Sequence, residues 1–311
     1  MSVRESNSSP GKIFGGCVVG SLLIVSLFFL GACGDQPADE GDGEGVATLV
    51  AEATGFLGPE AVRYDPDQDI YFVGNFNGGG MDADNNGFIS RMNIDGTVEN
   101  LEFIQGGEGE VTLHAPRGMA ITGDTLWACD VNAVRGFDRH TGAPLATIDF
   151  SEMDTGFLND ITPGPDGALY VTDTGRDAVY RIAGGAISTV HQDSLLDSPN
   201  GITWDPERDR FMVVPYGGSQ HYFVWTMEDP SLTTEGSVSG AQLDGVEVVR
   251  GGDLVISSQA DSSLHVISNG TDRIVARLEG RPADIGYDAQ RHRVAVPYIA
   301  RNLVEIWQLP E

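Results

Sequence analysis

A short unit of polar and apolar positions recurs along most of the chain, beginning near residue 57. Each copy starts with a polar residue and a small or apolar pair, passes through a turn containing Asp or Gly, and ends in a short apolar strand. One copy pairs residues 159–161 with 169–171, and another pairs 200–202 with 211–213. After a longer first interval, the copies stand roughly 40–45 residues apart. The polar residues that open them are Glu60, Arg117, Asn159, Asn200, Asp244 and Asp284.

Each unit extends into two further predicted strands, such as residues 178–182 and 186–190, with Gly, Asn and Asp in the turns. Four short strands in this spacing are typical of one blade of a β-propeller. The last copy ends after residues 304–307 without its outermost strand, and residues 46–50 can supply it, which leaves no open edge. The sequence therefore predicts an all-β protein whose residues 46–311 form a six-bladed β-propeller.

The first 45 residues follow a different pattern. Residues 13–32 form an uncharged apolar run after a basic N-terminus, as in a signal segment or a membrane anchor. At its end, Leu30-Gly31-Ala32-Cys33 resembles the lipobox of bacterial lipoproteins, whose cysteine is acylated. We expect residues 1–32 to be a lipoprotein signal peptide, Cys33 to carry the lipid, and the acidic residues 33–45 to be a disordered tether. We therefore expect an exported lipoprotein that is membrane-anchored in the bacterial cell envelope. The alternatives are an uncleaved transmembrane anchor and plain secretion.

Charge and composition narrow the possible chemistry. The formal net charge of -28 should repel phosphates, so we expect no nucleic-acid partner. Lys12 is the only lysine, so the predicted propeller can contain neither a Schiff-base lysine nor a phosphate-loop lysine. Of the three cysteines, Cys17 lies in the apolar run and Cys33 in the lipobox, which leaves Cys129 without a partner. We expect Cys129 to be a buried, small hydrophobic residue.

The innermost strand of each propeller blade begins at the mouth of the central channel, so the six opening residues should converge there. We call these six the mouth ring. Two carboxylates, Glu60 and Asp244, and two amide oxygens, from Asn159 and Asn200, together make an all-oxygen set that we name the oxygen quartet. Such a set is preferred by Ca²⁺ and, less often, by Mg²⁺ or Mn²⁺. We therefore expect the oxygen quartet to bind one divalent cation, with Ca²⁺ as the first candidate. The alternative is that the ring arginine pairs with a ring aspartate and that water fills the mouth.

The oxygen quartet resembles the metal ligands of the gluconolactonase/regucalcin (senescence marker protein) family, which are six-bladed propellers. The resemblance spans nearly the whole predicted propeller. The chain departs from the family at Phe157, because members of the family often have an arginine there that holds the sugar acid. Residues 172–181 also resemble a blade of NHL-repeat propellers, many of which bind without catalysis. The matching elements are Glu60 with Tyr64, Asn159-Asp160, Ser198-Pro199-Asn200-Gly201 and Asp244-Gly245.

This resemblance implies a divalent-metal-dependent hydrolase of lactones or related carboxylic esters. Asp244 would act as the general base, with Asp284 beside it as a second proton acceptor, and Arg117 and Asp284 would contact the substrate. The partner would be a small-molecule ester or lactone, and the membrane would be reached only through the lipid anchor. The alternative is a non-catalytic, lipid-anchored propeller that binds a ligand or a protein in the cell envelope.

Two further features concern the same face. Residues 82–90 place oxygen ligands at alternate positions with a glycine at the sixth, as an EF-hand loop does, but Asn93 replaces the glutamate at the twelfth. We expect an acidic turn or lid there. His114 lies three residues before Arg117 and is expected at the rim of the mouth without a catalytic role.

Overall fold

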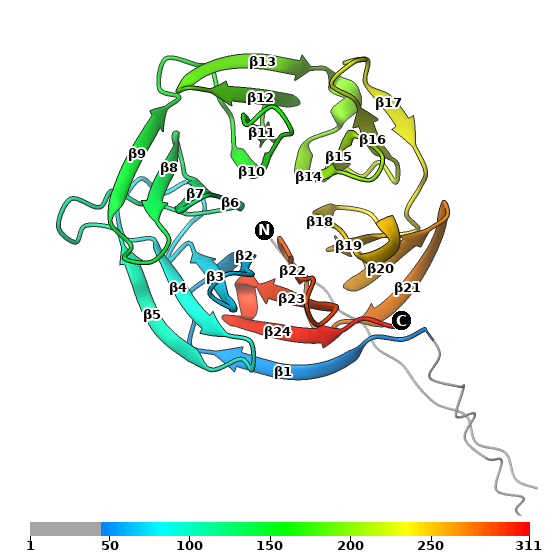
Figure 1. Ribbon diagram of the computed structural model, residues 1–311, viewed down its shortest axis with the longest axis horizontal. Coiled ribbons are helices and arrows are strands. Elements are labelled where there is room, and N and C mark those ends of the chain that lie inside the picture. The colour runs from blue at the N-terminus through cyan, green and yellow to red at the C-terminus, as the bar shows by residue number, and fades with distance from the viewer. Residues whose placement is uncertain (1–44) are drawn as a thin grey trace, which may run out of the picture. The chain divides into compact units, whose positions relative to one another are not determined.

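The computed structural model describes residues 45–311, which form six four-stranded antiparallel sheets around a central axis (Figure 1). The predicted all-β, six-bladed propeller is therefore confirmed. Among the described residues, no helix is long and apolar enough to cross a membrane. The predicted signal peptide, the lipidation of Cys33 and nearly all of the tether concern residues 1–44, outside the described part of the chain.

Blades one to three each use four consecutive strands, numbered from the axis outwards. Blade one contains β2 (Pro59–Asp65), β3 (Ile70–Asn75), β4 (Phe88–Asn93) and β5 (Val98–Gln105). Blade two contains β6 (Met119–Thr122), β7 (Thr125–Cys129), β8 (Ala133–Asp138) and β9 (Pro144–Asp149). Blade three contains β10 (Leu158–Pro163), β11 (Leu169–Asp173), β12 (Ala178–Ala183) and β13 (Ala186–Gln192).

Blades four and five repeat this order, whereas blade six combines both ends of the described chain. Blade four contains β14 (Pro199–Asp205), β15 (Arg210–Pro215), β16 (Tyr222–Trp225) and β17 (Thr233–Glu235). Blade five contains β18 (Leu243–Val248), β19 (Leu254–Ser258), β20 (Ser263–Ser268) and β21 (Thr271–Arg277). Blade six contains β22 (Gly286–Asp288), β23 (Arg293–Tyr298), β24 (Leu303–Gln308) and β1 (Thr48–Thr54). Three short 3-10 turns, η1 (Ser194–Leu196), η2 (Arg250–Gly252) and η3 (Ile299–Arg301), complete the elements.

Strand β1 closes the ring by pairing with β24 along the outer side of blade six (Figure 1). The pairing runs from Thr48 opposite Gln308 to Thr54 opposite Leu303. The sequence predicts this closure, although the strand begins two residues later than position 46. With β1 added, blade six has four strands, as many as its neighbours. Strand β1 also covers the outer backbone groups of β24, which would otherwise form an open edge.

Six apolar clusters fill the six interfaces between neighbouring blades. Between blades one and six, for example, Val62 and Tyr71 pack with Ala295 and Ile306. The alternation of each strand places one row of side chains in the interface on either side of its blade. The innermost strands are thus held from both sides, and they fix the position of whatever residues begin them.

A β-bulge lies at the start of the four innermost strands that carry the oxygen quartet. In β2, β10, β14 and β18 the register shifts after the first residue of the strand, and the quartet residue lies within the shifted stretch. A bulge leaves a residue outside the ladder and redirects its side chain. The glycine that follows the ring residue has a steric reason in blade four, because a Cβ on Gly201 would lie 2.3 Å from the carbonyl oxygen of Asp244. Neighbouring innermost strands approach each other closely at this level.

Candidate functional site

The oxygen quartet lines one cavity at the mouth of the propeller. Glu60, Asn159, Asn200 and Asp244 are the second residues of β2, β10, β14 and β18. Their side chains border a cavity of about 350 Å³. This volume lies near the lower end of the range for small-molecule sites. The structure therefore brings together the four residues that the sequence singles out as metal ligands.

Each member of the quartet is almost fully buried and keeps one oxygen without a hydrogen-bond partner among the described residues. These atoms are Glu60 Oε2, Asn159 Oδ1, Asn200 Oδ1 and Asp244 Oδ1. The four residues are only 3–4% exposed. Leaving a buried polar atom unpaired costs about 1–3 kcal/mol, so four such atoms in one cavity indicate a missing partner. Four carboxylate and amide oxygens fit a hard divalent cation such as Ca²⁺.

Neighbouring side chains orient the quartet so that these oxygens stay free. The Nδ2 of Asn159 donates a hydrogen bond to Thr174 Oγ1 at 2.9 Å, which leaves Oδ1 of the amide for the cavity. Thr174 in turn donates to the carbonyl oxygen of Pro199 at 2.7 Å. The Nε2 of Gln259 donates to Asp244 Oδ2 at 2.5 Å, so only Oδ1 of that carboxylate remains unpaired. The orientation of at least two members of the quartet is thus imposed by neighbouring side chains.

Thr174 and Gln259 belong to a second set of cavity residues that sequence reasoning missed. Each is the residue directly after the second strand of its blade. The same position supplies five cavity-lining residues, one from every blade except blade two, and we call these the wall positions. They are Phe76, Thr174, Tyr216, Gln259 and Ile299. The repeat spacing could have located them, although their side chains share no chemistry.

The electrostatics of the mouth favour a bound cation. Burial, the charge of Asp244 and that of Asp160 raise the pKa of Glu60, although Arg117 opposes them. Burial raises the pKa of Asp244 to about 7, against the lowering effect of the hydrogen bond from Gln259. Burial and the charge of Asp160 likewise raise the pKa of Asp284. Carboxylates that resist ionisation in this way would be stabilised in their charged form by a nearby divalent ion.

Arg117 and Asp284 complete the mouth ring, but neither lines the cavity. The Arg117 guanidinium is fully buried, and it donates to the carbonyl oxygens of Asp130 at 3.0 Å and Leu158 at 2.9 Å, and also to that of Gly80. Among the described residues it forms no ion pair with a ring aspartate. The structure thus places the two residues that the sequence assigns to substrate binding behind the cavity surface.

Asp284 joins the ring through its backbone. Its N–H donates to the carbonyl oxygen of Glu60 at 2.9 Å, and its own carbonyl oxygen accepts from Val62 at 3.1 Å. Asp284 Oδ2 is buried and has no hydrogen-bond partner among the described residues. Further along the axis, Arg63 of β2 forms an ion pair with Glu247 of β18. The channel below the ring is therefore occupied by charged side chains.

The remaining candidates lie away from the cavity surface. Asp82 accepts a hydrogen bond from the N–H of Gly79 at 2.8 Å, and Asp84 accepts one from Asn86 at 2.7 Å, as expected of an acidic turn. His114 Nδ1 accepts from the N–H of Asn85 at 2.9 Å. Cys129 is fully buried, as predicted. Within residues 45–311, no group of three or more His, Cys, Asp or Glu side chains is placed to hold a metal, so the oxygen quartet depends on its two amides.

Comparisons with known proteins identify the fold. No protein-family model matches the chain, and no curated protein sequence matches it. Among solved structures, a gluconolactonase from Xanthomonas campestris is similar, with 18% identity, a TM-score of 0.64, and coverage of 86% of this chain and 98% of that one. Virginiamycin B lyase from Staphylococcus aureus is similar too, with 15% identity, a TM-score of 0.62, and coverage of 85% and 99%. The chain thus shares the architecture of propellers that include a gluconolactonase and a lyase.

Proposed function

We propose that this propeller is a divalent-metal-dependent hydrolase of lactones or related carboxylic esters, with Ca²⁺ as the first candidate ion. The observation that carries the proposal is the set of four buried, unpartnered oxygens at equivalent positions of four blades. The gluconolactonase among the similar structures supports the choice of substrate class. Fold alone would not, because propellers have many unrelated activities.

The oxygen quartet would hold the cation. Bound there, a divalent cation supplies Lewis-acid chemistry, which polarises an ester carbonyl and stabilises negative charge on its oxygen. Glu60 and Asp244 contribute the two negative charges of the set, and Asn159 and Asn200 contribute neutral oxygens. The cavity beside the quartet has room for a small ester or lactone ring.

Asp244 is the residue we propose as general base. Gln259 holds one of its oxygens, and the other faces the cavity without a partner. This oxygen, which would be shared with the cation, can accept a proton from a water molecule as the water oxygen bonds to the ester carbonyl carbon. The bond from that carbon to the leaving oxygen then breaks, and the proton passes to the leaving oxygen. Asp284 is the second candidate for the proton, because its Oδ1 would lie 2.8 Å from a Cβ on Gly245, the residue after Asp244.

The test combines metal analysis with hydrolysis assays on purified residues 34–311. We expect one equivalent of divalent metal, and cleavage of lactones or aryl esters that a chelator removes and added Ca²⁺ restores. Asp244→Asn should weaken metal binding and abolish cleavage, whereas Asp82→Asn, a matched change in the exposed turn, should preserve both. Metal-free protein that cleaves no member of the panel would refute the proposal.

Product analysis separates hydrolysis from elimination, because a lyase is also among the similar structures. Hydrolysis in water labelled with heavy oxygen places the label in the carboxylic acid product. Elimination leaves that oxygen unlabelled and creates a carbon–carbon double bond. We expect the label in the product.

A further inference from the structure

The polar groups in the cavity wall are already paired within the protein. The Thr174 hydroxyl accepts from Asn159 and donates to the carbonyl oxygen of Pro199. The Tyr216 hydroxyl donates to Gln259 Oε1 at 3.1 Å and accepts from Arg281 at 3.2 Å. Because Gln259 also donates to the quartet, both ends of its amide have a partner. The wall therefore presents few groups that could recognise the hydroxyls of a sugar.

The rest of the wall is apolar. Phe76 enters from the segment after β3, Ile299 from the segment after β23, and Phe157 from the residue just before β10. No arginine, lysine or histidine of residues 45–311 lines this cavity. Its charged members are the two quartet carboxylates, which repel an anion unless a cation is bound. These walls favour an uncharged, apolar group.

Phe157 covers a buried cation beside the cavity. Its ring stacks on the Arg117 guanidinium, with 3.8 Å between Arg117 Cζ and the ring centroid. Phe157 lines the cavity and is half-buried, whereas Arg117 is fully buried. The aromatic ring thus separates the guanidinium from any ligand. An arginine that could hold a carboxylate or a hydroxyl is kept out of reach by one side chain.

We infer that the substrate is an uncharged lactone or ester that carries an aryl or alkyl group, and that Phe157 sets this preference by covering Arg117. The apolar group packs against Phe76, Phe157 and Ile299 while the ester carbonyl faces the oxygen quartet. Hydroxylated sugar lactones and anionic esters are disfavoured, because the wall offers them few free donors. This inference rests on the proposed hydrolase function and specifies its substrate.

Three lactones with the same six-membered ring test the preference in the full chain, with Ca²⁺ present. Dihydrocoumarin carries an aryl group, δ-decalactone an alkyl chain, and glucono-δ-lactone only hydroxyl groups. We expect kcat/KM for the first two to exceed that for the third by at least about tenfold, the scale of discrimination that apolar pockets reach. Equal or faster cleavage of glucono-δ-lactone would overturn the inference and leave the hydrolase proposal intact.

Phe157→Ala tests the role of the ring. The backbone at this position is held by Asp173, which accepts from the N–H of Phe157 at 2.7 Å, so the truncation should leave the segment in place. We expect kcat/KM for dihydrocoumarin to fall about tenfold. Binding of a carboxylate-bearing lactone should increase, because the Arg117 guanidinium becomes accessible. Phe157→Leu, which keeps an apolar cover, should lie between wild type and Phe157→Ala, and it serves as the test if the alanine variant fails to fold.

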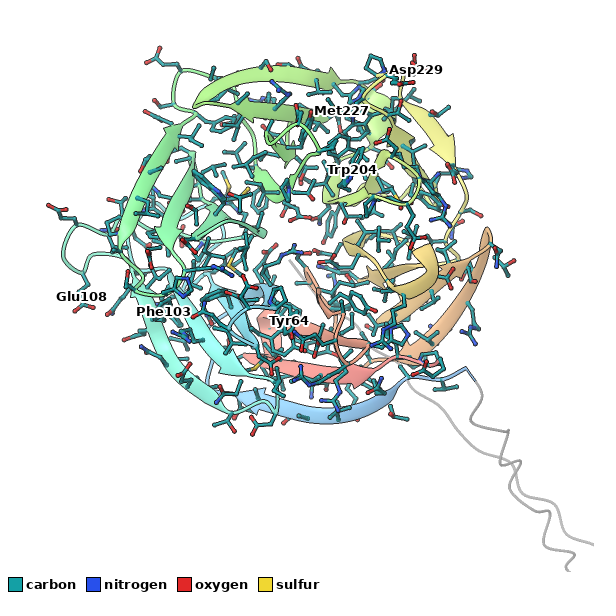
Figure 2. All side chains as sticks on the ribbon, in the orientation of Figure 1. Tyr64, Phe103, Glu108, Trp204, Met227 and Asp229 are labelled. Atoms are coloured by element: carbon teal, nitrogen blue, oxygen red, sulfur yellow. The ribbon has the colours of Figure 1, made fainter. Side chains whose placement is uncertain are left out.

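Phe103→Ala is the matched control. Phe103 of β5 also stacks on an arginine, with Arg91 Cζ 5.0 Å from its ring centroid, but it lies on the outer strand of blade one (Figure 2). In this variant, kcat/KM for the three lactones should follow the same order as in the wild type. If Phe103→Ala changes that order as much as Phe157→Ala does, the effect is not local to the mouth and the inference fails.

A binding measurement separates the two proposals. An aryl-substituted six-membered lactam has the shape of the lactone but resists cleavage, so calorimetry can follow its binding without turnover. Binding that Phe157→Ala weakens, in a protein that cleaves no lactone, would support the apolar pocket and refute the hydrolase. Absence of lactam binding together with a preference for hydroxylated lactones would overturn the pocket.

Discussion

Replacing Asp244 by asparagine removes one negative charge from the mouth while preserving the shape of the side chain. The Oδ1 of the new amide can accept the hydrogen bond that Gln259 donates to the carboxylate in the wild type. The substitution therefore isolates the charge of the residue from its packing. It should affect the free energy of unfolding in opposite directions with and without the metal.

Without metal, the variant should be more stable than the wild type. Burial raises the pKa of Asp244 from its ordinary value of 3.8 to about 7 in the folded protein. This raised value means that the folded state loses stability as the pH rises from about 4 through about 7, because ionisation is easier in the unfolded chain. At about 1.4 kcal/mol per pH unit, the difference reaches about 4 kcal/mol above pH 7. Asparagine does not ionise and avoids this cost.

With metal, the order of stabilities should reverse, so that the wild type is more stable than the variant. A cation present at more than about 1,000 times its dissociation constant stabilises the folded state by more than about 4.1 kcal/mol, which exceeds the cost of about 4 kcal/mol for the buried charge. In the wild type this gain already includes the relief of that cost, because the dissociation constant measures the whole effect of the ion. The variant loses one of only two carboxylate ligands and should gain much less from the same ion.

Urea denaturation at pH 8 checks the reversal, in excess Ca²⁺ and in excess chelator. Asp82→Asn removes a charge of the same sign from the exposed turn and should follow the wild type in both conditions. If Asp244→Asn and the wild type have equal stabilities with the chelator and equal stabilities with Ca²⁺, neither the buried charge nor the metal site exists as described.

Three further predictions concern the rest of the chain. Deleting residues 46–54 should expose the outer edge of β24 and lower the melting temperature and the soluble yield, and a monomer with wild-type melting would contradict the closure. Arg117→Met leaves three carbonyl oxygens unpaired and should cost about 3 kcal/mol or more in urea denaturation, whereas Arg176→Met at an exposed ion pair should change stability far less. Cys33→Ser should move the protein from the membrane to the soluble exported or unprocessed fraction. The reason is that Cys33 would carry the several acyl chains of a mature lipoprotein, and stable anchoring needs more than one chain. Unchanged fractionation with an intact N-terminus would favour a transmembrane anchor.

The blades and the oxygen quartet could be predicted because the repeat imposes one chemical pattern on equivalent positions. A polar residue followed by small or apolar residues marks the start of most innermost strands, and Gly201 shows why the position after the polar residue is small in blade four. The larger gap between Glu60 and Arg117 has a plain cause as well. The segments after β3 and β5 are longer in blade one than their counterparts in blades two and three.

The cavity wall could not be predicted from residue type. Its positions share a place in the blade but range from Phe76 to Gln259, so no recurring letter marks them. The direction of the Arg117 side chain was also beyond the sequence. It depends on carbonyl oxygens of blades one, two and three, including that of Gly80 in the long segment of blade one, which come together only in the closed ring.

The division between the oxygen quartet and the wall positions has a consequence for how such a protein can change. Strand starts hold the quartet, and each is buried between two blades, so few substitutions there would be tolerated. Among the wall positions, Phe76, Tyr216 and Ile299 follow directly after strands and make no hydrogen bond to the quartet, so their side chains can be exchanged without disturbing the sheet or the quartet. One scaffold could therefore acquire different substrates through single changes at these positions while the proposed metal ligands stay constant. Libraries restricted to these few positions are a direct route to new specificities.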